Sequence, residues 1–254
     1  MTSSSFISYY WKFAQLDAQI RVHVATLRSD DATPSESLEA WLRLLLSSDR
    51  AAVGVGLDWY SYLDAQRRFG RANPLAIGAT QALAVARQEL EATPVRSVTE
   101  NGVVVDGANF ASALGLLAVL GEPEDISQIH GVLSASEDNN VLLEGCLATG
   151  HVFLSLDAPP PGLVDRLAAI ARGPSYWPEV RGAAVSALGA MDTTEAEEAL
   201  IELVQSGIPL AAEAAVEILY RKAPNERREF VEDMIATTSD QTVRDRLIVL
   251  LSST

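Results

Sequence analysis

The sequence predicts an all-α fold, a right-handed α-solenoid of stacked helix pairs. A short apolar phrase, clearest at residues 180–189, recurs at 141–150, 210–219 and 243–250, and an earlier copy ends at 116–121. The copies are small and apolar at helical spacing, and they recur roughly every 30 to 40 residues, the period of helix-pair repeats. A more acidic helical segment follows each of the first four copies. Such units bury their apolar faces against one another, and the fold usually works as a binding surface.

Composition indicates a protein with a continuous core and no membrane span. The chain has 254 residues, of which 48% are apolar. No run approaches the roughly 18 apolar residues that cross a bilayer, and residues 1–6 lack the basic start of a secretory signal. The single cysteine, Cys146, lies on an apolar helix face and indicates a small core residue in a reducing compartment. We therefore expect a cytoplasmic location.

The negative charge is concentrated in the second half of the chain. Residues 1–107 hold 12 acids and 10 bases, whereas residues 108–254 hold 22 acids and 9 bases, so the formal charges are −2 and −13. A field of that sign repels phosphate backbones and anionic membrane surfaces, which argues against nucleic acid and membrane partners. It attracts a basic protein. The alternative interpretation is that the acidic surface only aids solubility.

The N-terminal part predicts less regular helices. Apolar spacings of three and four predict a long first helix, whose buried face is Phe6, Tyr10, Phe13, Leu16, Ile20, Val24 and Leu27. Ser35 predicts the N-cap of a second helix. Further helices are expected at 51–69, where Gly54 and Gly56 weaken the beginning, and at 74–90.

Residues 95–105 predict a small β-hairpin or an extended loop that rests on the helices. β-branched residues flank Asn101-Gly102, a pair that tolerates the positive φ angles of a tight type I′ turn. An isolated hairpin is marginal in water, so it needs support from neighbouring elements. We expect the hairpin to separate an atypical helical capping part, residues 1–107, from regular repeats in residues 108–254; the capping part would continue the solenoid.

Four helix pairs and one closing helix are predicted after the hairpin. They are 108–120 with 124–135, 138–155 with 162–172, 178–190 with 194–206, 209–221 with 225–237, and 240–252. Proline-rich connections at 159–161 and 173–178 lengthen the step between the second and third copies of the phrase. Insertions in solenoids collect on one face, often the binding face.

This pattern resembles HEAT repeats, and more loosely armadillo repeats and bacterial phycobilin-lyase-type HEAT proteins. The Val-Arg-x-x-Ala-x-x-Ala-Leu-Gly phrase at 180–189 and its weaker copies carry the resemblance. Arg181 and Arg244 match the arginine that is usual in the family, whereas Leu142 and Ala211 do not. The resemblance implies the architecture but selects no function, because the family includes scaffolds, inhibitors, transport factors and a few enzymes.

No constellation of residues points to catalysis or to a metal. His23, His130 and His151 lie far apart and in no metal-ligand spacing. Residues 54–56 lack the preceding strand and the third glycine of a phosphate-binding turn. Cys146 has no histidine and acid companions in the sequence. We therefore expect no cofactor, no metal site and no enzyme activity; a lyase-like HEAT enzyme is the least favoured alternative.

Two surfaces are candidates for partner binding. The first is the segment 58–64, where Trp59 and Tyr62 lie between two carboxylates, because aromatic residues dominate interface hot spots. The alternative interpretation is that these aromatics fill the core between the N-terminal helices and the repeats.

The second candidate is a column of acidic side chains. The resemblance implies that the second helix of each pair lines the concave surface. The residues off the apolar stripe of those helices are Asp125, Gln128, Asp165, Glu198, Glu202, Glu229, Glu232 and Asp233. Neighbouring repeats lie roughly 10 Å apart, about the Debye length at 0.1 M salt, so the fields of the carboxylates overlap. The alternative is a plain solvated helix face.

The leading interpretation is a non-enzymatic HEAT-like module whose acidic concave face binds a basic protein. Among such roles, the charge and the absence of a catalytic set favour an immunity protein or an inhibitor of a basic toxin or enzyme. The runner-up is a structural or regulatory scaffold that binds through the N-terminal aromatics.

Overall fold

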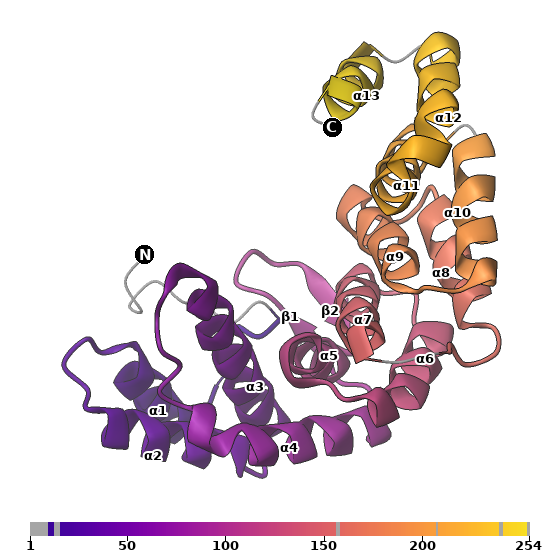
Figure 1. The fold of residues 1–254 in the computed structure, drawn as a ribbon. Coiled ribbons are helices and arrows are strands. Elements are labelled where there is room, and N and C mark those ends of the chain that lie inside the picture. The colour runs from indigo at the N-terminus through magenta and orange to yellow at the C-terminus, as the bar shows by residue number, and fades with distance from the viewer. Residues whose placement is uncertain (1–9, 13–15, 156–157, 207, 239–240, 253–254) are drawn as a thin grey trace. The chain divides into compact units, whose positions relative to one another are not determined.

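The computed structural model describes residues 10–12, 16–155, 158–206, 208–238 and 241–252. These ranges contain thirteen α-helices and one two-stranded sheet, which confirms the predicted all-α class (Figure 1). The chain divides into two compact units, Met1–Val152 and Phe153–Thr254. The change from a capping part to regular repeats at residue 107 stays a prediction. No helix in the described ranges is both long and apolar enough to span a membrane.

The first unit is a two-layered stack of helices. Its helices are α1 (Ala18–Arg28), α2 (Pro34–Leu45), α3 (Arg50–Ala65), α4 (Ala79–Glu91), α5 (Ala108–Leu120), α6 (Ile126–Ala135) and α7 (Asn139–Val152). Helices α3, α5 and α7 pack side by side in one row, and α4 and α6 form a second row against α5 and α7. Helices α1 and α2 extend the stack beyond α3.

Helix α5 is the centre of the first unit. It contacts α3, α4 and α7, and its Leu114, Leu116 and Leu117 side chains are fully buried. The helix is apolar on all sides and rich in alanine, as expected for a helix without a solvent face. Its small residues let the neighbouring helices approach closely.

Two aromatic residues near the N-terminus, Tyr10 and Trp11, contact α3, α5 and α7. Trp11 donates a hydrogen bond from Nε1 to Ser112 Oγ at 2.9 Å on α5, and its indole lies against Gly54 on α3. The Tyr10 hydroxyl donates to Glu144 Oε1 on α7. Both aromatic side chains are buried, although neither residue is helical.

The first helix is therefore shorter than the apolar spacing predicts. It begins at Ala18, where Asp17 caps it by accepting from Gln19 N at 2.8 Å. Tyr10 reaches the core from a bend rather than from a helix stripe, and Phe6 and Phe13 lie outside the described residues. The second helix is capped by Thr33 and Glu36 in a capping box, with Pro34 at its start, and not by Ser35.

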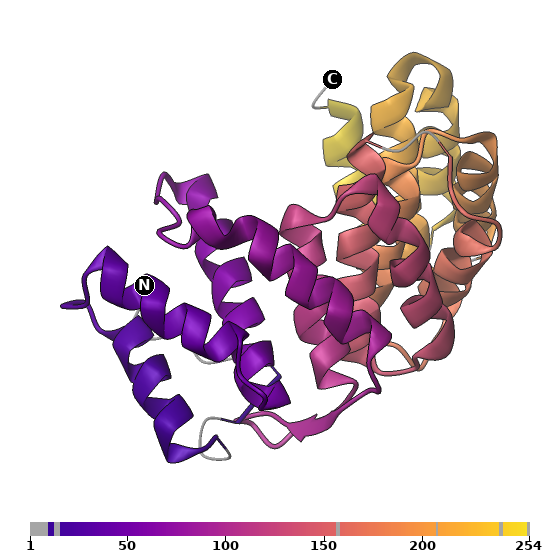
Figure 2. The same cartoon turned by 90° about the horizontal axis from the view of Figure 1, so that it is seen from below.

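The predicted hairpin is present, with a different turn. Strands β1 (Arg96–Val98) and β2 (Val104–Asp106) pair antiparallel, with Ser97 opposite Val105 (Figure 2). Gly102 has a positive φ, whereas no described non-glycine residue does, so Asn101 does not adopt a type I′ turn. Instead the Thr99 N–H donates to the Val103 carbonyl oxygen at 2.9 Å, which closes a three-residue loop.

The hairpin rests on the helices through Asn109 at the start of α5. The side chain of Asn109 accepts from Val95 N at 2.7 Å and donates to the Glu89 carbonyl oxygen at 3.1 Å on α4. Val105 is fully buried, so the inner face of the hairpin belongs to the core.

The second unit also has two rows of helices. Its helices are α8 (Leu163–Arg172), α9 (Pro178–Ala190), α10 (Thr194–Gln205), α11 (Pro209–Lys222), α12 (Pro224–Thr237) and α13 (Gln241–Ser252). Helices α9, α11 and α13 form one row, and α8 and α10 pack beside each other in the second. A cluster of Val216, Tyr220, Val231, Val243 and Leu247 joins α11, α12 and α13. The helices expected after the hairpin thus agree with the observed ones to within a few residues.

We expect Gly54→Ala to destabilise the first unit, because an added methyl group would overlap the Trp11 indole. The free energy of unfolding should fall by about 1–3 kcal/mol, the usual cost of overpacking. Gly131→Ala on α6 is the matched control, since nothing lies within 4 Å of its added methyl group. There the higher helix propensity of alanine should stabilise by up to about 1 kcal/mol. Urea denaturation measures both; equal effects would contradict the packing of Trp11.

Candidate functional site

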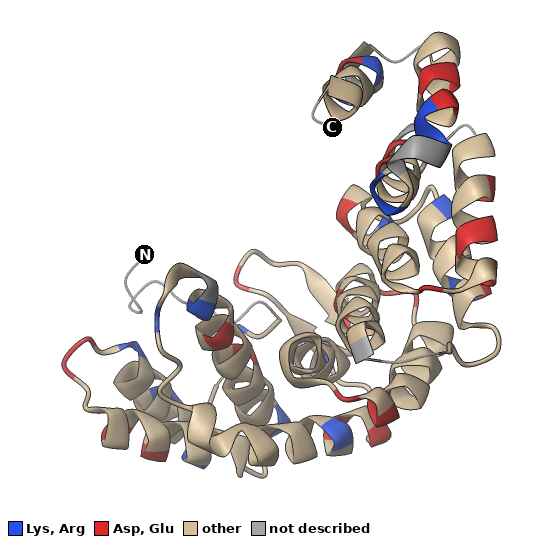
Figure 3. Cartoon of the chain, viewed as in Figure 1, with Lys and Arg blue, Asp and Glu red and all other residues tan. Residues whose placement is uncertain are grey.

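An acidic groove lies between α8 and α10 in the second unit. Its walls include Asp165 and Arg172 from α8 and Glu195, Glu198 and Glu202 from α10, and residues 159–161 also line it. The groove has a volume of about 450 Å³. Figure 3 shows the acidic residues along α10. Four carboxylates thus face one arginine, which leaves a formal charge of −3.

Helical spacing places three of the four glutamates of α10 on one face. Glu195, Glu198 and Glu202 recur at intervals of three and four residues, while Ala196, Leu200 and Leu203 are buried on another face. Thr193 caps the helix by accepting from Ala196 N. Asp165 and Glu195 lie in the first turns of their helices, where the helix dipole stabilises negative charge.

Only one of these carboxylates has a basic partner in the groove. The Arg172 Nη2 atom donates to Glu202 Oε2 at 2.7 Å. Asp165, Glu195 and Glu198 are exposed, and within the described part of the chain none of them forms an ion pair. The groove therefore keeps charge that a cationic partner can neutralise.

The structure brings together three of the predicted acidic residues, Asp165, Glu198 and Glu202, and adds Glu195 to them. Glu195 lies one turn before Glu198 on the same face, and that spacing could have found it. The residues predicted on α12, namely Glu229, Glu232 and Asp233, are exposed but do not line the groove. Glu232 accepts from Arg228 at 2.9 Å.

The structure corrects the prediction that Asp125 belongs to a partner-binding surface. Its side chain is only 2% exposed and stabilises the fold. Its carboxylate accepts from Arg87 Nε on α4 at 2.5 Å and from the Glu122 N–H at 2.8 Å. Hydrogen bonding to Asp125 raises the pKa of the Arg87 guanidinium group. A carboxylate held in this way cannot contact a partner.

The structure also corrects the prediction that Trp59 is available to a partner. Trp59 lies on α3, is 1% exposed and belongs to the hydrophobic core. Tyr62 lies one turn further along the helix and lines a separate groove. Trp59 therefore fills the core, as the alternative interpretation of this segment expects. Of the two aromatic candidates, Tyr62 is the one that lines a groove.

This second groove, which we call the Glu144 groove, lies within the first unit. Residues of α3, α5 and α7 and of the 3₁₀ helix Gln66–Phe69 enclose about 910 Å³, and they include Tyr62, Phe69, Arg71, Gly115, Glu144 and Leu147. Glu144 is not among the predicted site residues, although it is the single acid in the otherwise apolar phrase at 141–150. A lone acid on an apolar helix face could have indicated it.

Glu144 has an unusual environment for a carboxylate. Burial raises the pKa of its carboxyl group, and the hydrogen bond from Tyr10 opposes the rise. Burial favours the neutral form because a charge loses its hydration in the interior. No basic side chain in the described ranges pairs with it.

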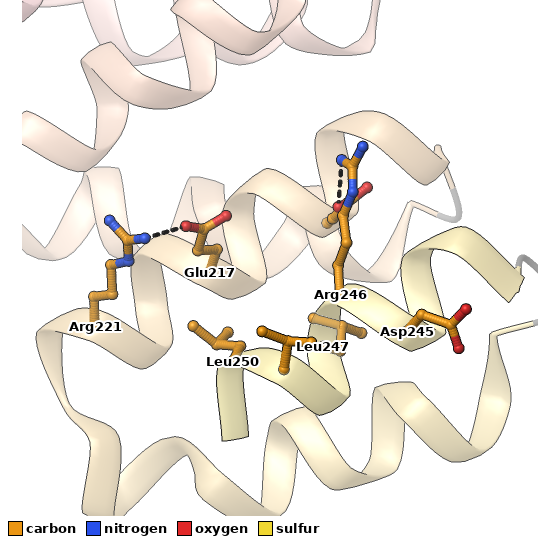
Figure 4. A pocket seen from close by; sticks show the side chains of 8 residues that line it. Glu217, Arg221, Asp245, Arg246, Leu247 and Leu250 are labelled. Atoms are coloured by element: carbon orange, nitrogen blue, oxygen red, sulfur yellow. Dashed lines mark hydrogen bonds and ion pairs between the residues drawn. The ribbon is translucent and has the colours of Figure 1, made fainter. Parts of the chain in front are cut away.

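A third cavity, between α11 and α13, contains paired charges. It has a volume of about 470 Å³ and is lined by Leu247 and Leu250 (Figure 4). Arg246 donates to Glu213 at 2.8 Å, and Arg221 pairs with Glu217 at 2.5 Å. Its two glutamates are thus already neutralised. Over the residues that can be described, no cluster of histidine, cysteine and acids could hold a metal ion.

The arginines of the repeated phrase show how the helices are paired. Arg181 on α9 donates from Nε to the Ala171 carbonyl oxygen at 3.1 Å, in the last turn of α8. Arg244 on α13 donates likewise to Ile235 at 3.3 Å, in the last turn of α12. Each arginine satisfies a carbonyl group that has no partner within its own helix. In both cases the helix that carries the phrase is joined to the end of the helix before it.

Comparison with known proteins identifies one similarity. Residues 161–252 match a protein-family model described as HEAT repeats. The match begins just before α8 and ends in α13, so the second unit is similar to HEAT repeats along almost all of its helices. HEAT repeats are generally non-enzymatic and indicate a protein-interaction or scaffold module. No curated protein matches the chain.

The prediction that the acidic residues line a concave surface stays a prediction. The structure shows that Asp165, Glu198 and Glu202 share a groove between α8 and α10, and we define the acidic groove by the residues that line it.

We expect Glu144→Gln to raise the free energy of unfolding at pH 7 by on the order of 1 kcal/mol. The pKa of Glu144 is raised in the folded state, so the folded protein binds this proton more tightly than the unfolded chain does. The carboxylate therefore costs no stability below its ordinary pKa and costs progressively more as the pH rises through the folded-state pKa. A glutamine oxygen can still accept from Tyr10.

Denaturation at several pH values measures this difference, which should disappear below about pH 4. Glu39→Gln on α2 is the control, since Glu39 is exposed and only 3.6 Å from Arg43 in a surface pair. Its effect should stay within about 0.5 kcal/mol. A glutamine variant of Glu144 that is less stable than the wild type at pH 7 would contradict the assigned environment.

Proposed function

We propose that this protein is a non-enzymatic binding module whose acidic groove, formed by α8 and α10, binds a basic protein. The observation that supports this most directly is the formal charge of −3 in a groove with three unpaired carboxylates. HEAT repeats occupy this part of the chain, and they commonly mediate protein–protein contacts. Complementary charge gives fast association that weakens with salt.

Within this role, we favour an inhibitor or immunity protein that masks a basic toxin or enzyme. The support is the concentration of negative charge in residues 108–254, which carry a formal charge of −13. A field of this size steers a basic partner toward the groove before contact. The alternative role, a scaffold that binds through the N-terminal aromatics, now depends on Tyr62, because Trp59 is buried.

The double variant Glu195→Lys with Glu198→Lys should abolish capture of the partner. Immobilised protein is incubated with extract of its source cells at about 0.05 M and about 0.5 M salt, and bound proteins are identified by mass spectrometry. The wild type should retain a basic protein at low salt and release most of it at high salt. Binding to the double variant should be at least about tenfold weaker, because attraction becomes repulsion.

The matched control is Glu229→Lys with Asp233→Lys on α12. It changes the net charge equally, at exposed residues that lie outside the groove. Capture by the control should stay close to that of the wild type. Equal losses in both variants, or capture that is indifferent to salt, would refute the groove as the binding surface. If the captured protein keeps its activity in the complex, the inhibitor role fails while the binding role stands.

A further inference from the structure

The Glu144 groove presents one open carboxylate oxygen. Oε1 of Glu144 accepts from Tyr10, whereas Oε2 lies beside Gly115 on α5. A methyl group on Gly115 would be 3.3 Å from Oε2 and would cover it. The absence of a side chain at Gly115 therefore leaves this oxygen open toward the groove.

Within the described part of the chain, no basic side chain pairs with the Glu144 carboxylate. Arg71 lines the same groove, but it is exposed and forms no ion pair with Glu144. A desolvated and unpaired carboxylate gains from a cation much more than an exposed one does, because the local dielectric is lower and screening is weaker. The Glu144 carboxylate can therefore act as the counterion of a cation that enters the groove.

The walls of the groove suit an apolar body attached to that charge. Phe69 is 68% exposed and Leu147 is 45% exposed, and Tyr62, Ala118 and Val119 continue the lining. Aromatic faces attract ammonium and guanidinium groups. The volume of about 910 Å³ lies in the range of small-molecule sites, which are mostly apolar with a few polar groups that fix orientation.

We propose that the Glu144 groove binds a small organic cation, an ammonium or guanidinium group on an apolar or aromatic body, with the Glu144 carboxylate as its counterion. Tyr10 holds the carboxylate in position, and Tyr62 and Phe69 contact the body of the ligand. This site lies in the first unit and does not depend on the acidic groove of the second unit.

Isothermal titration calorimetry on the full chain tests the site with four cations and one neutral compound. The cations are 2-phenylethylamine, tryptamine, agmatine and spermidine, and 2-phenylethanol is the neutral counterpart of the first. At least one cation should bind with a Kd below about 1 mM, and 2-phenylethanol should bind at least about tenfold more weakly than 2-phenylethylamine.

Three variants separate a counterion from a general effect of charge. Glu144→Gln should weaken the cation that binds at least about tenfold, because it removes the charge and keeps the shape. Glu39→Gln, which removes a charge elsewhere in the same unit, should change the Kd less than twofold. Arg71→Gln should leave the affinity unchanged or raise it, because it removes a like charge from the groove.

The proposal is overturned if none of the four cations binds, or if Glu144→Gln binds them as the wild type does. It is also overturned if the amines fail while an arginine-rich peptide binds and loses affinity in Glu144→Gln. In that case the groove holds a side chain of a protein partner and not a small molecule. Circular dichroism confirms that each variant is folded before titration.

Discussion

Close packing between helices stabilises this protein, and small residues at the contacts allow the helix backbones to approach one another. Helix α5 contacts three other helices, and alanine, serine and glycine occupy much of its surface. Gly54 receives the indole of Trp11, and the carbonyl group of Gly56 accepts from Trp41 Nε1 at 2.8 Å. A single pair of helices that are apolar on several sides would expose apolar surface to water. Stacking against neighbouring helices buries that surface.

The same close packing sorts the carboxylates into two kinds. Asp125, Glu89 and Glu213 are buried and bind arginines from other helices, which joins elements that are distant in sequence. Such pairs are structural, because losing one partner would leave a buried charge. Among the described residues, Glu144 has no arginine partner, and neither do Asp165, Glu195 and Glu198 of the acidic groove. Their negative charge is available to a cationic ligand or partner, because no described arginine neutralises it.

Periodicity was sufficient to predict the helical class, the hairpin and the helices after residue 108, because an apolar stripe reports directly on burial. It failed where tertiary contacts decide. Tyr10 has helical spacing but reaches Glu144 from a bend, and Asp125 looks like a surface acid until Arg87 is brought beside it. The hydrogen bond from Arg181 to the end of α8 was also beyond the pattern, since the acceptor of a side-chain donor depends on the tertiary structure. The acidic groove was predicted in part, because Asp165, Glu198 and Glu202 share a face that helical spacing specifies.

Arg181 on α9 and Arg244 on α13 each bind the end of the preceding helix, and Ala211 stands at the matching place on α11. Stacked helical repeats exchange stability only with their neighbours. The acidic groove is shared by α8 and α10, two helices that pack beside each other. A cation that touched both walls would therefore act as a clasp between adjacent repeats and stiffen the array against shearing at that joint.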